Sequence, residues 1–117
     1  MRERFDLMGR DIVLPAELAF DLSMVLHELA TNSMKCGALS RFVGTIALTW
    51  QLRRTGHADR VLRIDWSEPA PSSWTAENGT RFGAKLKRLL IENKWKGQIE
   101  VDASDEYRWS CTIPLPA

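Results

Sequence analysis

A carboxylate, an amide and an ammonium group follow one another along a single predicted helix. Glu28, Asn32 and Lys35 are spaced four and three residues apart, with His27 beside them, so the three side chains project from one helical face. Amide and carboxylate oxygens suit the hard Mg²⁺ ion, which binds through few protein ligands and shares phosphates and waters with them. Such a triplet can hold a hydrated divalent metal and nucleotide phosphates. The polar spacing by itself favours the alternative, an ordinary helix with one solvated face.

The helix that carries these groups also has an apolar stripe. Leu22, Val25, Leu26 and Leu29 recur at three- and four-residue steps, which is typical of a helix packed on a sheet. Pro15 fits the first helical turn, where its missing N–H is not needed. We therefore predict a helix over residues 16–36, with Gly37 as its C-cap.

Strands surround this helix in the sequence. Ile46, Leu48, Trp50 and Leu52 alternate with more polar residues, which predicts a strand with one buried face. Similar patterns predict further strands over residues 4–8, 12–14, 61–66, 98–103 and 107–115. A second helix is predicted over 82–94, with Leu86, Leu89, Leu90 and Asn93 on its inner side and Lys85, Lys87, Arg88 and Lys94 on solvated faces. Helices on one face of a mixed, mostly antiparallel sheet make an α+β two-layer sandwich.

Bulk properties narrow the class of protein. The 117 residues predict a single domain over 1–117. A hydrophobic fraction of 44% argues against disorder, and a net charge of +1 provides no overall field to recruit nucleic acid or a membrane. No apolar run has the length of a membrane-spanning helix and no signal-peptide pattern is present, so we expect a cytoplasmic domain in which Cys36 and Cys111 are reduced, buried thiols.

Two motifs connect this chain to a known family. The run from His27 to Ser40, HELATNSMKCGALS, resembles the N box of a sensor histidine kinase, and Trp66-Ser67-Glu68 resembles the Trp-x-Glu signature of the HWE branch of that family. The resemblance extends over nearly the whole chain. It implies the ATP-binding catalytic domain of such a kinase, with the Bergerat fold that the family shares with gyrase, Hsp90 and MutL-type ATPases.

The resemblance also implies roles for the N-box residues. Asn32 would hold Mg²⁺ against the ATP triphosphate, and Glu28 would assist proton transfer or position the phosphoacceptor. Lys35 would lie near the phosphates. His27 would help to orient the γ-phosphate; the alternative is a histidine that is hydrogen-bonded under the neighbouring loop.

The remaining motifs match the family less completely. Glu68 stands where the family has the acidic residue that accepts a hydrogen bond from the adenine amino group, whereas Trp66 is predicted to lie in the core. Ala70 and Pro71 replace a Gly-Gly pair, and the family's second glycine box, Gly-Phe-Gly, is here Arg81-Phe82-Gly83. Proline removes backbone freedom and an N–H, whereas the Arg81 guanidinium suits a phosphate oxygen or would obstruct the site.

Three functions remain open at this stage. The first is the catalytic domain of a sensor histidine kinase, which uses Mg·ATP to phosphorylate a histidine on a dimerisation and phosphoacceptor domain, with a response regulator downstream. The second, motivated by Ala70, Pro71 and Arg81, is a degenerate module that no longer binds ATP and docks a response regulator. The third is a serine kinase of the anti-sigma-factor type, which the Trp66-x-Glu68 match disfavours.

Overall fold

The computed structural model describes residues 5–36, 44–54, 60–69, 81–103 and 106–115, with the backbone alone for Cys36, Arg81 and Phe82. A single mixed sheet has the strand order β1-β2-β3-β5-β4. The strand β1 is parallel to β2, and the other neighbours are antiparallel. The bounds are β1 Phe5–Met8, β2 Ile46–Arg54, β3 Arg60–Glu68, β4 Gln98–Asp102 and β5 Tyr107–Leu115.

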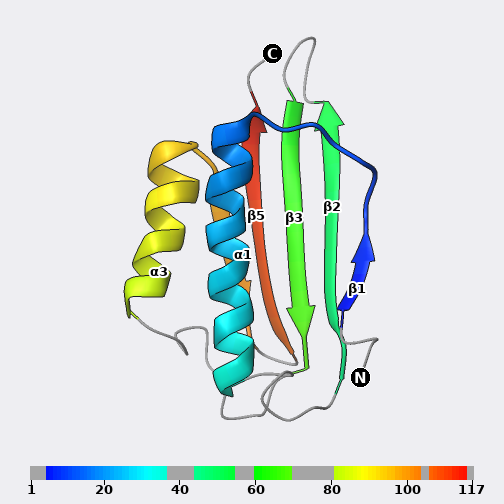
Figure 1. Ribbon diagram of the computed structural model, residues 1–117, viewed down its shortest axis with the longest axis vertical. Helices are drawn as coiled ribbons and strands as arrows, with labels where there is room; N and C mark the ends of the chain where they lie inside the picture. The colour runs from blue at the N-terminus through cyan, green and yellow to red at the C-terminus, as the bar shows by residue number, and fades with distance from the viewer. Residues whose placement is uncertain (1–4, 37–43, 55–59, 70–80, 104–105, 116–117) are drawn as a thin grey trace.

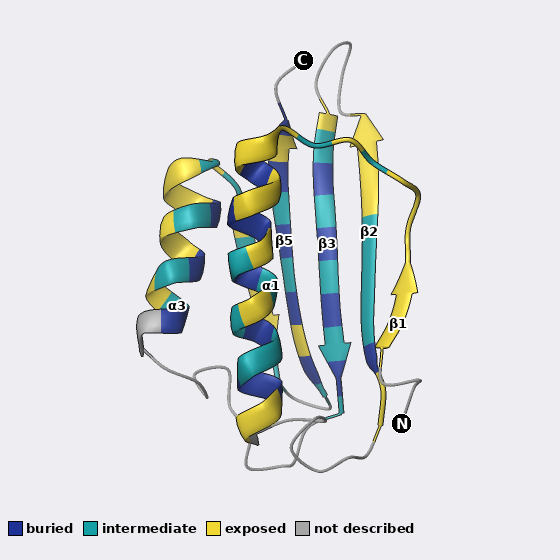
Figure 2. Ribbon diagram, viewed as in Figure 1, coloured by how far each residue is buried: buried dark blue, intermediate teal, exposed yellow. Residues whose placement is uncertain are grey.

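Both helices lie on the same face of this sheet (Figure 1). The helix α1 spans Ala16–Cys36, as predicted, and α3 spans Arg81–Arg88. The buried stripe of α1 packs on the inward side chains of β3 and β5, among them Ile64, Trp66 and Trp109 (Figure 2). The predicted α+β two-layer sandwich is therefore confirmed, and Trp66 lies in its core.

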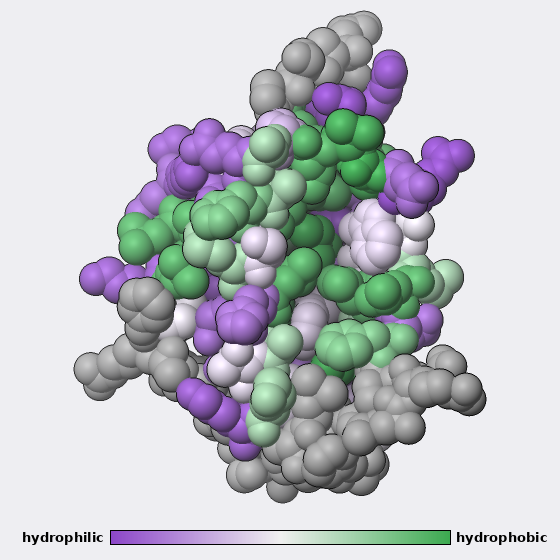
Figure 3. Space-filling model, in the orientation of Figure 1, coloured by the Kyte–Doolittle hydropathy of each residue, from purple (hydrophilic) through white to green (hydrophobic). Residues whose placement is uncertain are grey.

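The helices cover only part of the inner face. In Figure 1 they lie over the β3–β5–β4 side, whereas β2 and β1 extend beside them. Consequently the prediction of a fully buried face on β2 is wrong: Ile46 is buried, Leu48 and Trp50 are half-buried and Leu52 is exposed. An apolar hollow follows this uncovered strip (Figure 3). Its lining comes from α1, β2, β3 and the segment before α1: Arg10, Asp11, Ile12, Leu14, Ala19, Leu22, Ser23, Leu26, Leu48, Trp50, Leu62 and Ile64.

The segment before α1 is held by a side chain rather than by strand pairing. The Trp50 indole donates a hydrogen bond of 2.7 Å to the Arg10 carbonyl oxygen. Gly9 permits this approach, because a Cβ there would fall 2.1–2.4 Å from the Trp50 ring. The strand predicted over 12–14 is therefore wrong: these residues form an irregular segment whose side chains, those of Ile12 and Leu14, pack against the core.

The second helix changes its hydrogen-bonding pattern halfway. After α3 the chain continues as a π-helix, η1, over Leu89–Lys94, and the Trp95 N–H donates to the Leu90 carbonyl five residues earlier. The predicted inner leucines differ in burial: Leu90 packs partly buried against the core, whereas Leu89 is exposed. The prediction of the inner face is thus wrong in part, since Leu89 is 45% exposed and Asn93 is exposed, whereas the buried positions are Gly83, Lys87 and Ile91.

A polar contact joins the end of η1 to the first half of α1. The buried Asp21 carboxylate accepts hydrogen bonds from the Lys94 ammonium at 2.8 Å and from the Trp95 indole at 2.7 Å. Burial acts to raise the pKa of Asp21, but the hydrogen bonds from Lys94 and Trp95 and the charge of Lys94 outweigh it, so the pKa lies below its usual value of 3.8. This Asp21 clasp fixes the far end of the second helix against α1.

None of the helices in the described ranges is long and apolar enough to cross a lipid bilayer.

Candidate functional site

The centre of the predicted site is a contact between two residues one turn apart on α1. The Asn32 side-chain amide donates a hydrogen bond of 2.8 Å to Oε1 of Glu28. Their four-residue spacing places both side chains on the same helical face, as predicted. The bond also sets the orientation of the amide, because a carboxylate oxygen accepts only from the NH₂ end. The carbonyl oxygen Oδ1 of Asn32 is consequently turned away from Glu28.

That carbonyl oxygen is an acceptor without a partner. Asn32 is 3% exposed, and among the described residues its Oδ1 is the buried side-chain polar atom that lacks a hydrogen bond. Leaving a buried acceptor unsatisfied is costly, so such an atom usually has a ligand or a function. An amide oxygen is a suitable hard ligand for Mg²⁺. The residues present therefore fit the ion that the sequence predicted.

The metal would have few ligands from the described part of the chain. The described residues include no group of three or more His, Cys, Asp or Glu side chains that would enclose an ion. Mg²⁺ commonly binds in this way, through one or two protein groups plus substrate phosphates and waters.

A buried lysine reaches Glu28 from the second helix. The ammonium of Lys87 lies 3.1 Å from Glu28 Oε1, and the two side chains are only 9% and 11% exposed. The prediction that Lys87 lies on a solvated face is therefore wrong. One signal in the sequence points to its burial: Lys87 follows Gly83 and precedes Ile91 by four residues each, the spacing of a single helical face.

The first turn of α3 approaches Glu28 closely. A Cβ built on Gly83 would lie 2.3 Å from Cδ of Glu28 and 2.4 and 2.6 Å from its two oxygens. Gly83 was predicted to contact the cofactor, and it is buried directly beside the proposed catalytic carboxylate. Arg81 is the first residue of α3, although its side chain lies outside the described set.

Glu68 is held by two donors that sequence reasoning did not anticipate together. It ends β3 and is 1% exposed. The hydroxyl of Ser33 donates to Oε1 at 2.6 Å and the Trp66 indole donates to Oε2 at 2.6 Å. Ser33 lies four residues after Leu29, so its spacing places it on the buried stripe of α1.

Tyr107 is a further buried polar residue beside Glu68. It pairs with Glu68 across the β3–β5 ladder and is 2% exposed. Burial raises the pKa of its hydroxyl, and the negative charges of Glu68 and Glu28 raise it further. The phenol therefore stays neutral at physiological pH.

The other predicted residues line a groove beside this centre. The described lining is Ser23, Met24, His27, Glu28, Thr31, Lys35 and Leu86. His27 and Lys35 are exposed on it, so the structure brings His27, Glu28 and Lys35 to one surface, with Asn32 turned further inward. Ala70 and Pro71, which replace the expected glycine pair, lie outside the described residues.

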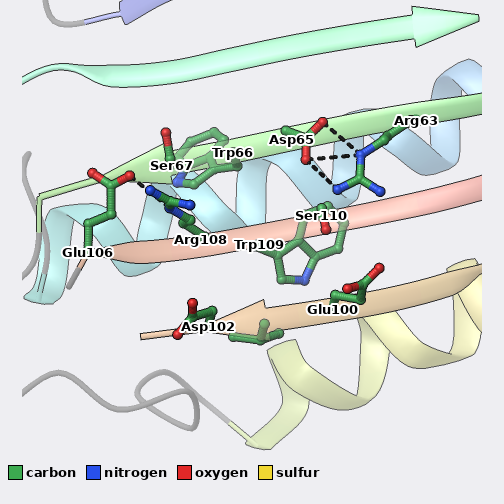
Figure 4. A pocket seen from close by; sticks show the side chains of 11 residues that line it. Arg63, Asp65, Trp66, Ser67, Glu100, Asp102, Glu106, Arg108, Trp109 and Ser110 are labelled. Atoms are coloured by element: carbon green, nitrogen blue, oxygen red, sulfur yellow. Dashed lines mark hydrogen bonds and ion pairs between the residues drawn. The ribbon is translucent and has the colours of Figure 1, made fainter. Parts of the chain in front are cut away.

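A second hollow lies on the sheet face opposite the helices (Figure 4). Its guanidinium groups are engaged by neighbours on their own strands or turns: Arg63 binds Asp65 at 2.9 Å and Arg108 binds Glu106 at 2.9 Å. It shares no residue with the groove beside Glu28. The N-box residues His27, Glu28 and Lys35 therefore line the groove on the helical face, whereas the motif residues Trp66 and Ser67 line this second hollow.

Two relatives found by comparing sequences have the same name. A protein from Rhizobium johnstonii named blue-light-activated histidine kinase is 35% identical over 98 residues, 84% of this chain and 28% of the relative. A protein of the same name from Brucella anthropi is 28% identical over 85% of this chain and 20% of its own length. The chain therefore spans less than a third of either relative. No model of a known protein family matches it.

Solved structures agree on the fold. A blue-light activated histidine kinase of Erythrobacter litoralis matches 96% of this chain with a TM-score of 0.76 at 17% identity, over 35% of that protein. The catalytic domain of histidine kinase ThkA matches 97% of this chain with a TM-score of 0.56 at 15% identity, over 80% of that domain. The chain is therefore similar in sequence to part of two proteins named blue-light-activated histidine kinase, and it has the Bergerat fold of histidine kinase catalytic domains.

Proposed function

We propose that this chain is the ATP-binding catalytic domain of a two-component sensor histidine kinase. It would bind Mg·ATP and transfer the γ-phosphoryl group to a histidine on a separate dimerisation and phosphoacceptor domain, its own or a partner's. A response regulator would then receive the phosphoryl group. The observation that carries the proposal is the buried, unpartnered Oδ1 of Asn32 beside the Glu28 carboxylate.

The transfer itself needs little covalent chemistry from the protein. A nitrogen of the acceptor histidine attacks the γ-phosphorus, the bond to the β–γ bridging oxygen breaks, and ADP leaves. Bound Mg²⁺ supplies neutralisation of the charge on the phosphate oxygens. Glu28, which lines the groove, is placed to take the imidazole proton or to orient the acceptor ring.

The other side chains bind and orient the nucleotide in this proposal. Asn32 supplies an oxygen ligand for the metal, and Lys35 neutralises phosphate charge at the groove. Arg81 and the first turn of α3 around Gly83 would receive phosphate oxygens. His27 would orient the γ-phosphate. Glu68, fixed by Ser33 and Trp66, would accept the adenine amino group.

Isothermal titration of the 117-residue chain with ATP, with and without Mg²⁺, tests the proposal. We expect saturable binding that is much tighter with Mg²⁺ than without it and is lost in Asn32→Ala. Asn93→Ala is the matched control, because Asn93 is exposed on η1, and it should bind as the unmodified chain does.

Absence of binding at millimolar nucleotide would refute the proposal. It would indicate that the departures at Ala70, Pro71 and Arg81 have closed the site, and would favour the module that docks a response regulator. Titration with a receiver domain would then be the next measurement.

A further inference from the structure

Lys87 is a buried cation whose charge needs explanation. Lysine is rarely buried unless it is paired, and an unpaired buried ammonium is strongly disfavoured. Lys87 has its ammonium 3.1 Å from Glu28 Oε1, with both side chains largely enclosed. The described residues that line the groove include Glu28 but not Lys87. The contact with Glu28 is thus the link between Lys87 and the described lining of the groove.

The same carboxylate oxygen connects Lys87 to Asn32. Oε1 of Glu28 lies 3.1 Å from the Lys87 ammonium and 2.8 Å from Asn32 Nδ2. One atom thus receives a donor from each helix. If the carboxylate were free to rotate, the Asn32 amide would lose the contact that distinguishes its nitrogen from its oxygen. By holding the carboxylate, Lys87 therefore helps to determine whether Oδ1 or Nδ2 of Asn32 faces a ligand.

We infer that Lys87 is a positioning residue for the metal site. It holds the Glu28 carboxylate in place, the carboxylate fixes the Asn32 amide, and Oδ1 of Asn32 is thereby directed toward the Mg²⁺ that accompanies the nucleotide. This inference rests on the proposed function and adds to it a residue on the second helix. Groups that orient a metal ligand in this way typically change metal affinity about 10- to 100-fold when they are removed.

Four variants of the second helix separate this role from simple packing. Lys87→Met keeps a stem of similar length without the charge, Lys87→Arg keeps the charge, and Lys87→Gln keeps a donor without the charge. Lys85→Met is the matched control, because it removes an exposed lysine from the same helix. Should Lys87→Met fail to fold, Lys87→Leu, which also lacks a donor and a charge, takes its place in each measurement.

The first measurement uses no nucleotide. The side-chain NH₂ signals of Asn32, assigned by their loss in Asn32→Ala, are followed by ¹H–¹⁵N NMR. We expect the hydrogen-bonded proton to exchange slowly in the unmodified chain and in Lys87→Arg. Lys87→Met should speed this exchange and bring the two proton shifts together, whereas Lys85→Met should leave both unchanged.

The second measurement compares ATP affinity with and without Mg²⁺. Lys87→Met should reduce the enhancement by Mg²⁺ about 10- to 100-fold and leave Mg²⁺-free affinity unchanged; Lys87→Arg should restore most of it. Unchanged Asn32 signals in Lys87→Met, or equal losses of affinity with and without Mg²⁺, would overturn the inference. If the unmodified chain binds no ATP, the proposed function fails, and the NMR result still decides whether Lys87 orients Asn32.

Discussion

Replacing Gly83 by alanine sets two effects of opposite sign against each other. Gly83 is the third residue of α3, and alanine is favoured over glycine within a helix by up to about 1 kcal/mol. An account based on helix propensity alone predicts a more stable protein. The structure predicts the reverse, because the new methyl carbon would lie 2.3 Å from Cδ of Glu28.

The loss of stability in Gly83→Ala comes from the contacts that the Glu28 carboxylate would lose. A carboxylate at the end of a flexible side chain can swing away from a methyl group, but here it accepts from both Lys87 and Asn32. A hydrogen bond to a charged group is worth about 1.5–3 kcal/mol. Losing one of these contacts, less a gain in helix propensity of up to about 1 kcal/mol, predicts that Gly83→Ala lowers the free energy of unfolding by about 0.5–3 kcal/mol.

Urea unfolding followed by circular dichroism measures this change, and a double-mutant cycle identifies its cause. On a Glu28→Ala background the overlap no longer exists, so Gly83→Ala should be neutral or stabilising there. Ala84→Gly, at the next position of α3, is the control: it should cost up to about 1 kcal/mol on either background. Stabilisation of the unmodified chain by Gly83→Ala, or an equal cost on both backgrounds, would refute the reasoning.

Two further predictions concern charged and buried groups away from the site. Asp21→Ala leaves the Trp95 indole without this hydrogen-bond acceptor and removes the buried partner of Lys94. Urea unfolding should therefore show a free energy of unfolding that is lower by about 3 kcal/mol. Glu17→Gln, whose side chain is 68% exposed, should cost under about 1 kcal/mol. Because the pKa of Asp21 is lower in the folded protein than its usual 3.8, the stabilisation by its carboxylate is complete above about pH 4 and is lost as pH falls further. In Asp21→Asn, the urea midpoint of unfolding should therefore change less with pH below about pH 4 than in the unmodified chain. An equal change with pH in both proteins would contradict this. Burial raises the pKa of the Cys111 thiol to about 12, so thiol reagents at pH 8 should label it only after urea is added.

The parts of the fold with a simple period were predictable from the sequence. The helix over Ala16–Cys36 and the strand over Tyr107–Leu115 have the predicted bounds, because their apolar residues recur without interruption. The pairing of Glu28 with Asn32 was equally accessible, since it depends on helical spacing alone. Local periodicity determines contacts that lie within one element.

Contacts between elements were predicted less well. The inner face of the second helix depends on where α-helical hydrogen bonding gives way to π-helical bonding, which the leucine spacing does not specify. The burial of Lys87 depends on a carboxylate 59 residues earlier in the chain. Trp66 reaches Glu68 within β3, but Ser33 reaches it from α1. Such pairs become visible only when the sheet and the helices are assembled.

The π-helical segment η1 also affects how this part of the chain can be aligned with related sequences. A π-helical turn accommodates one more residue than an α-helical turn between the same flanking positions. Removing one residue between Leu89 and Lys94 would therefore allow regular α-helical bonding while Lys94 and Trp95 keep their places beside Asp21. A relative that is one residue shorter here should accordingly be aligned with its gap inside η1, so that its lysine and tryptophan still meet the aspartate.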